Sequence, residues 1–289
     1  SIRRRVCDAA DAAGRDADDI TIVAVAKTVG PPEVRDAIAA GVTDFGENRV
    51  QEFVAKHGLF QQARWHFIGT LQSNKAQHVV GRAHLIHSVD SIHLLERIDR
   101  IADTMGVVQP VLLQVNVAHE NSKHGLTPDE AAEVLRASLE LPAVEVKGLM
   151  TMAPYARAES VRWVFHDLRE LFESLASLRF NGVEMTELSM GMTNDFEVAV
   201  EEGATIVRIG RAIFGTVADE REHENREEHP ETGDAAERDR PGRRVQESGK
   251  GDQGDQLPCL TEEAGELHHD RATLRREPGR YEAQHAGED

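Results

Sequence analysis

The chain has 289 residues, enough for one large core, and its 51 acidic residues outweigh 33 lysines and arginines to give a net charge of −18. The basic run at Arg3–Arg5 is too small to neutralise a phosphate backbone, so we expect no nucleic acid partner. No stretch approaches the roughly 18 apolar residues of a membrane span, and the two cysteines, Cys7 and Cys259, are too few for a disulfide framework, which together predict a soluble cytoplasmic protein.

The predicted elements begin with a helix at about residues 2–13 and then alternate between short β-branched strands and amphipathic helices. Helix start signals fall between the strands: two prolines open the stretch that ends in Gly41, and Thr127 stands as a candidate N-cap ahead of Pro128. The expected strands span residues 20–27, 44–48, 65–69, 85–89, 110–117, 146–152, 187–192 and 205–210.

Eight strands that are each followed by a helix predict an α/β fold, a (β/α)8 TIM-type barrel with an extra N-terminal helix. An open, doubly wound sheet is the structural alternative. We expect the barrel to occupy residues 1–217. Residues 218–289 are acidic and lack periodic apolar residues, so we expect a disordered C-terminal tail.

The first strand ends in Lys27, after the apolar run "TIVAVA". A barrel gathers the carboxyl ends of its strands at one mouth, where such enzymes carry their chemistry. A lysine there is either a solvated residue that closes a strand or an amine that forms a Schiff base with a carbonyl compound. Position alone leaves both readings open.

The last two strands carry residues suited to an anion. The strand at 187–192 delivers Ser189 and Gly191 and leads to Thr193, where hydroxyls and free N–H groups suit a phosphate. The strand at 205–210 ends with Arg208 and Gly210, and TIM barrels often bind phosphate in the loops after their last two strands. Turn glycines and an Asp195 N-cap with no ligand would produce the same pattern.

Four histidines are further candidates for the site. His66 lies at the expected mouth, where a polar residue more often caps the next helix than contacts a cofactor. The spacing of His84, His87 and His93 indicates different faces, so no metal site is expected.

Seven stretches in order resemble the pyridoxal phosphate homeostasis proteins of the YggS/PROSC type, over about residues 2–215. They are "VAVAKT", "DFGENRVQE", "WHFIGTLQSNK", "NSKHGL", "GLMTMAP", "LSMGMTNDFEVAV" and "VRIGRAIFG". Any one of these motifs would be weak evidence, whereas seven in the family's order are specific.

The resemblance implies a barrel similar to the N-terminal domain of alanine racemase, with pyridoxal 5'-phosphate held as an aldimine. Lys27 matches the aldimine lysine, Arg208 the residue that faces the pyridine nitrogen, and Asn48 a neighbour of the ring. The residues matched to the phosphate are Ser189, Gly191, Thr193, Gly210 and Arg211. Thr193 stands where serine is expected and keeps the hydroxyl. Arg211 stands where threonine is often expected, so for residue 211 the resemblance implies a phosphate contact from the backbone N–H and not from the side chain.

The arginine opposite the ring nitrogen predicts weak catalysis, because a carboxylate there would keep the ring protonated and strongly electron-withdrawing. We therefore expect a cofactor carrier or buffer whose partners include apo enzymes that use pyridoxal phosphate, and the resemblance implies a monomer. The alternatives are a pyridoxal-phosphate-dependent amino-acid racemase and a cofactor-free aldolase that uses Lys27 as its Schiff-base residue. A racemase would need a second base, and the chain offers only Tyr155 and Tyr281 as tyrosines.

Overall fold

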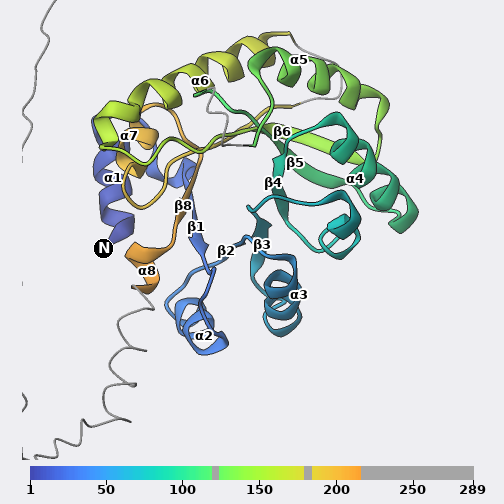
Figure 1. Ribbon diagram of the computed structural model, residues 1–289. Coiled ribbons are helices and arrows are strands. Elements are labelled where there is room, and N and C mark those ends of the chain that lie inside the picture. The colour runs from blue at the N-terminus through green and yellow to red at the C-terminus, as the bar shows by residue number, and fades with distance from the viewer. Residues whose placement is uncertain (119–123, 179–183, 216–289) are drawn as a thin grey trace, which may run out of the picture. The chain divides into compact units, whose positions relative to one another are not determined.

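A computed structural model describes residues 1–118, 124–178 and 184–215 of the chain. Eight parallel strands form a closed barrel in sequence order, with the helices outside it (Figure 1). The strands are β1 (Thr21–Val25), β2 (Asp44–Glu47), β3 (Arg64–Phe67), β4 (Leu85–Val89), β5 (Gln109–Gln114), β6 (Val144–Met150), β7 (Glu187–Ser189) and β8 (Ile206–Ile209). The helices are α1 (Ile2–Ala12), α2 (Pro31–Ala39), α3 (Val50–Leu59), α4 (Ile92–Met105), α5 (Pro128–Ala137), α6 (Arg162–Ser177), α7 (Phe196–Glu201) and α8 (Arg211–Phe214).

The barrel closes because β1 pairs with β8 along its length. Val23 lies opposite Arg208 and Ala24 opposite Ile209 in this parallel ladder. An open doubly wound sheet leaves its edge strands unpaired, so the closing ladder excludes that alternative. The predicted (β/α)8 barrel with a leading helix is confirmed, and all eight expected strands are present with ends that differ by a few residues.

One connection differs from the regular α-helical pattern. A 3-10 helix, η2 (Ser73–His78), follows β3 in place of an α-helix. The other helix signals behave as expected. Pro31 starts α2 at a position where its missing N–H has no intrahelical partner, and Thr127 forms a capping box with Glu130 at the start of α5.

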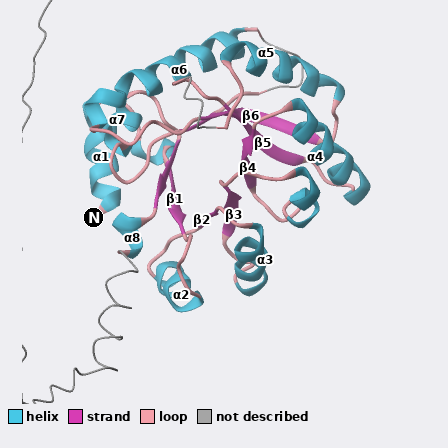
Figure 2. Cartoon of the chain, in the orientation of Figure 1, coloured by secondary structure: helices cyan, strands magenta, loops and turns pink. Residues whose placement is uncertain are grey.

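The core has two layers, one between the strands and the helices that surround them (Figure 2) and one inside the barrel. The larger layer lies between strands and helices and includes the fully buried rings of Phe45, Trp65 and Phe67. The smaller layer fills the inside of the barrel with one side chain from each of five strands: Val23, Leu85, Leu112, Met150 and Ile206. Gly46 makes room for it, since an added Cβ would lie 2.9 Å from Val23 Cγ1.

Helix α1 packs against α7, so the start of the chain supports the last part of the barrel (Figure 1). The Arg5 guanidinium lies 4.6 Å from the centroid of the Phe196 ring and forms an ion pair with Glu197. The expected tail at 218–289 lies outside the described residues, and the boundary at residue 217 stays a prediction. None of the helices in the described ranges has the length and apolarity needed to cross a lipid bilayer.

Candidate functional site

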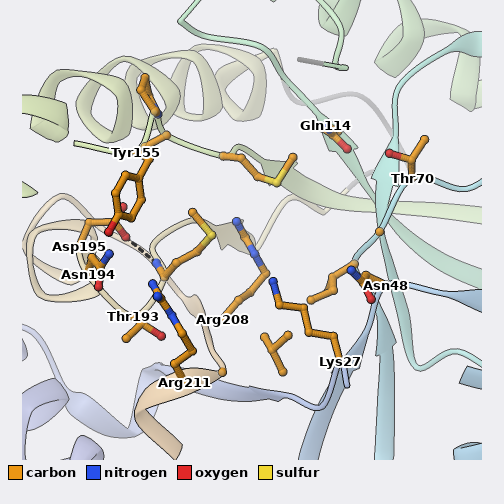
Figure 3. Close-up of a pocket in the computed structure, with 18 of the residues that line it drawn as sticks. Lys27, Asn48, Thr70, Gln114, Tyr155, Thr193, Asn194, Asp195, Arg208 and Arg211 are labelled. Atoms are coloured by element: carbon orange, nitrogen blue, oxygen red, sulfur yellow. Dashed lines mark hydrogen bonds between the residues drawn. The ribbon is translucent and has the colours of Figure 1, made fainter. Parts of the chain in front are cut away.

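A cavity of about 630 Å³ opens at the carboxyl ends of the strands. Six of the eight predicted site residues line it: Lys27, Asn48, Thr193, Arg208, Gly210 and Arg211. Figure 3 shows Lys27, Arg208 and Arg211 reaching into this space from the segment after β1, from β8 and from the start of α8. Volumes of a few hundred Å³ are typical of sites for small ligands, so the cavity suits a cofactor or substrate of that size.

Lys27 reaches the cavity because it continues the inward-facing side of β1. Side chains alternate across a strand; Val23 belongs to the layer inside the barrel, and Val25 and Lys27 both line the cavity. Lys27 itself is exposed. The amine is therefore open to a ligand from the solvent side.

The chain after Lys27 has an unusual backbone. Thr28 has a φ of 62°, and it is the one non-glycine residue with positive φ in the described ranges. Such a conformation costs on the order of 1–3 kcal/mol and persists only where its surroundings impose it. Thr28 Oγ1 donates a hydrogen bond to the Lys27 carbonyl at 2.6 Å.

A buried ion-pair cluster, the Lys56 cluster, lies behind this turn and comprises Glu47, Glu52 and Lys56. Lys56 Nζ donates to the Ala26 carbonyl at 2.7 Å and to Glu47 Oε1 at 2.5 Å, with Glu52 Oε2 at 3.4 Å. The second oxygen of Glu47 accepts the Asn48 N–H at 2.9 Å. The cluster thus ties the residue before Lys27 to the residue before Asn48, and it fixes the spacing of two cavity residues from different strands.

The side of the cavity formed by β7 and β8 carries the groups suited to an anion. Thr193 lies in the turn before α7, and Gly210 and Arg211 lie where β8 passes into α8. In the turn before α7, the Asp195 carboxylate accepts a hydrogen bond from the Met192 N–H at 2.6 Å, drawn as a dashed line in Figure 3. Burial raises the pKa of Asp195, although this hydrogen bond and the charge of Arg208 oppose the rise.

Ser189 and Gly191 lie deeper than the cavity lining. Ser189 is completely buried, and its hydroxyl contacts Arg208 and His87. Gly191 has a φ of 90°, and a Cβ there would lie 2.6 Å from Ala199 Cβ, so the turn into α7 requires glycine. Its carbonyl accepts the Arg208 backbone N–H at 3.0 Å. In this structure both residues support Arg208.

Arg208 is a buried cation held by uncharged acceptors. It is 4% exposed, and its guanidinium donates to Ser189 Oγ at 2.6 Å and to the Thr151 carbonyl at 2.8 Å. Burial lowers the pKa of Arg208 to about 10, while Asp195 raises it, so the group stays protonated at neutral pH. A guanidinium has only donors, so Arg208 presents the cavity with donors and positive charge.

Hydrogen bonds continue from Ser189 across the inside of the barrel. We call the five residues Asp44, His66, His87, Ser189 and Arg208 the histidine chain. His87 Nδ1 lies 2.9 Å from Ser189 Oγ, His87 Nε2 lies 2.9 Å from His66 Nδ1, and His66 Nε2 lies 3.1 Å from Asp44 Oδ1. All five residues are buried.

The sequence patterns do not predict the histidine chain, since they place His66 at the mouth or at a helix cap. The imidazoles of His66 and His87 face the inside of the barrel, and the His84 ring meets the His66 ring edge-on with a centroid distance of 5.3 Å. The available signal was alternation, because Leu85 and His87 share one face of β4, as Ile206 and Arg208 share one face of β8. Across the residues that the structure describes, no group of three or more His, Cys, Asp and Glu residues could hold a metal ion.

At this site Lys27 supplies an exposed amine, Arg208 and Arg211 supply guanidinium groups, and Thr193 supplies a hydroxyl. Lys27 can attack or condense with a carbonyl carbon, since a lysine amine forms Schiff bases with such groups. Arg208, Arg211 and Thr193 supply the positive charge and donors that an anionic group requires. The arrangement fits a small molecule that carries both a carbonyl and a phosphate.

Comparison with known proteins agrees with this chemistry. A family model described as "Alanine racemase, N-terminal domain" matches residues 3–218. The pyridoxal phosphate homeostasis protein of Aquifex aeolicus is 44% identical over 217 residues, which cover 74% of this chain and 94% of that protein. The chain belongs to the pyridoxal phosphate homeostasis protein family. Its Escherichia coli K12 relative is 38% identical over 219 residues, 74% of this chain and 93% of that protein.

Solved structures extend the comparison within and beyond the pyridoxal phosphate homeostasis protein family. PipY of Synechococcus elongatus with pyridoxal phosphate bound is 36% identical, with a TM-score of 0.65, over 74% of this chain and all of that chain. An alanine racemase from Clostridium difficile is 14% identical, with a TM-score of 0.59, over 74% of this chain and 55% of that chain. The second likeness shows the shared barrel fold alone.

Proposed function

We propose that this protein binds pyridoxal 5'-phosphate in the cavity at the barrel mouth and serves cofactor homeostasis as a carrier or buffer. The observation that carries the proposal is the position of Lys27, an exposed amine across the cavity from a turn suited to phosphate. The pyridoxal phosphate bound to PipY and the names of the relatives support the same cofactor. We expect the protein to act as a cytoplasmic monomer that supplies apo enzymes.

The residues of this chain match the parts of the cofactor. Lys27 would bind the aldehyde carbon through its amine, and the carbonyl oxygen would leave as water. Thr193, the N–H groups at Gly210 and Arg211, and the Arg211 charge would hold the phosphate, and Asn48 would contact the ring; all four residues line the cavity. Ser189 and Gly191 act indirectly, through Arg208 and the turn into α7.

Arg208 limits what the bound group can catalyse. Pyridoxal phosphate can stabilise a carbanion, and it does so most strongly when its ring nitrogen is protonated. A guanidinium that faces this nitrogen would donate to it and keep it from being protonated, whereas a carboxylate would favour protonation. This electrostatic arrangement favours holding the cofactor over catalytic turnover.

A racemase remains the second candidate because the barrel fold is shared with alanine racemase. Racemisation needs a second acid–base group on the opposite face of the ring. The tyrosine among the described cavity residues is Tyr155, which is 87% exposed at the rim. Tyr281 lies outside the described residues. Steady racemisation by pure, cofactor-loaded protein would overturn the carrier proposal.

Substitution of Lys27 tests the binding mode. Lys27→Ala and Lys27→Arg should both remove the visible absorption band of the bound cofactor, because neither side chain forms the C=N bond. Both variants should remain folded, since Lys27 is exposed and lies outside the core. Lys75→Ala serves as the control, because this lysine on η2 does not line the cavity.

Borohydride reduction and mass spectrometry complete that test. Reduction should fix one cofactor on the Lys27-containing peptide of the wild-type protein and none on the variants. A reducible visible band that survives in Lys27→Ala would place the bond on another lysine and contradict the assignment. Protein without any reducible band would favour the cofactor-free aldolase.

A further inference from the structure

We propose that His87 is a positioning residue for Arg208, held in one tautomer by His66 and Asp44 so that Ser189 always offers its oxygen to the guanidinium. This inference rests on the proposed function, in which Arg208 faces the cofactor ring. The histidine chain carries the inference, because its members come from five different strands yet every contact lies within 3.1 Å.

Proton positions can be assigned from the Asp44 end. The Asp44 carboxylate only accepts hydrogen bonds, so His66 Nε2 must carry a proton and donate to Oδ1. A neutral His66 then has a bare Nδ1, and this atom accepts from His87 Nε2–H. A neutral His87 in turn has a bare Nδ1 that accepts the Ser189 O–H.

The Arg208 end gives the same assignment independently. Arg208 Nη1 can only donate, so Ser189 Oγ accepts from it at 2.6 Å. The Ser189 proton is then available for His87 Nδ1, as the Asp44 end requires. Every donor in the histidine chain thus points away from Arg208 and toward Asp44.

The opposite tautomer does not fit these partners. With a proton on His87 Nδ1, both His87 and Arg208 would donate to Ser189 Oγ. The Ser189 O–H would then find no acceptor in either group. Burial, together with the nearby charge of Arg208, holds the pKa of His87 well below its usual value, which agrees with a neutral ring. The structure therefore favours a single pattern of protons.

This pattern explains how Arg208 is oriented without a carboxylate bound directly to it. Ser189 Oγ holds Nη1 and the Thr151 carbonyl holds Nη2, which fixes the plane of the guanidinium. The negative charge that stabilises the arrangement, that of Asp44, lies at the far end of the histidine chain. The acceptors bound directly to Arg208 are uncharged, and Asp195 acts on it only through its charge, so the guanidinium presents positive charge to the cavity.

The first test reads the tautomers in the wild-type protein, without cofactor. Two-bond 15N–1H correlation spectra distinguish Nδ1–H from Nε2–H in each imidazole. His66 and His87 should both be neutral with the proton on Nε2, and their signals are identified by their loss in His66→Gln and His87→Gln. A proton on Nδ1 of His87, or a charged ring, would overturn the proposal.

The second test reverses the histidine chain with Asp44→Asn. Arg64 and Thr43 both donate to Oδ2, so an asparagine should keep its carbonyl there and turn its amide toward His66 Nε2. Both imidazoles should then move their proton to Nδ1. Asp99→Asn is the matched control, because this buried carboxylate caps the Ala143 N–H outside the histidine chain and should leave both tautomers unchanged.

The third test links the tautomer to the cofactor. Asp44→Asn should bind pyridoxal phosphate on the order of tenfold more weakly than the wild type, the loss expected for one charged hydrogen bond. If Asp44→Asn does not fold, Ser189→Ala replaces it, with the same expected loss. Asp99→Asn should bind as the wild type does. A tautomer change with unaltered affinity would overturn the positioning role. Failure of the wild-type protein to bind pyridoxal phosphate would contradict only the proposed function, since the spectra need no cofactor.

Discussion

The Lys56 cluster and the histidine chain are two buried polar networks that solve different problems. In the Lys56 cluster, opposite charges meet directly, with Lys56 Nζ 2.5 Å from a Glu47 carboxylate that is completely buried. In the histidine chain, the charges of Arg208 and Asp44 stand at opposite ends, with the side chains of Ser189, His87 and His66 between them. The first network ties backbone segments together, and the second orients a side chain.

The pKa values of the buried carboxylates Glu47 and Asp44 shift in opposite directions. Burial raises the pKa of Glu47, although the hydrogen bond and charge of Lys56 oppose the rise. Burial also acts on Asp44, but hydrogen bonds from His66, Arg64 and Thr43 outweigh it and hold the pKa of Asp44 well below its usual range. The number of donors that reach a buried carboxylate, and not its burial alone, decides whether ionisation favours the fold.

The largest expected effect comes from breaking the direct ion pair. Lys56→Met leaves the Glu47 charge buried without its partner and should lower the free energy of unfolding by about 3–5 kcal/mol, measured by urea denaturation. Lys147→Met is the control, because its pair with Glu145 is partly exposed and should contribute at most about 1 kcal/mol. The double variant Lys56→Met with Glu47→Gln should recover part of the loss; no recovery would contradict the ionic explanation.

Breaking the charged end of the histidine chain should have a smaller, pH-dependent effect. Asp44→Asn should lower the free energy of unfolding by roughly 2 kcal/mol at neutral pH, the scale of a hydrogen bond to a charged group. The folded pKa of Asp44 lies below its unfolded value, so its contribution is complete above about pH 5 and is lost as the pH falls through about 4 and lower.

Urea midpoints of wild type and Asp44→Asn between pH 3 and 7 check this sign. The difference in the free energy of unfolding should be constant near neutrality and narrow in acid. A difference that widens as the pH falls would show that Asp44 ionises at a cost to the fold, as burial alone would predict.

The smallest effects on stability are expected at two exposed arginines, each of which pairs from outside with a carboxylate of one network. Arg64 pairs with Asp44 and Arg49 with Glu52, and the side chains of both arginines are more than half exposed. Arg64→Gln and Arg49→Gln should each lower the free energy of unfolding by less than about 1 kcal/mol, and the loss should shrink in salt. Arg64→Gln should have the larger effect, since Asp44 is more buried than Glu52. Equal, salt-independent losses in both variants would contradict this ranking.

The fold could be predicted because its signals are local. The apolar run at 20–26 and the prolines after it fix β1 and α2, and Thr127 with Glu130 fixes the start of α5. Lys27 could also be placed at the barrel mouth, because it ends the first strand, but its assignment as the cofactor lysine came from the family resemblance.

The interior of the barrel could not be predicted in the same way. His87 and Ser189 are 102 positions apart, and Lys56 contacts the Ala26 carbonyl across 30 positions. Such contacts depend on the register of strands and on helix orientation, which no single stretch encodes. The motif resemblance matched Ser189 to the phosphate because a motif shows which residues accompany a site but not what each side chain contacts. The structure shows that the Ser189 hydroxyl contacts Arg208 and His87.

The pairing of β1 with β8 has a consequence for how the protein is made. Lys27 lies near the start of the chain and Arg208 near the end of the described barrel, and α1 packs on α7. Contacts of such long sequence separation form slowly, and they cannot form on the ribosome until the last strand has emerged. The cofactor site can therefore assemble only when synthesis of the barrel is nearly finished, and any binding during synthesis would select chains whose first and last strands have already met.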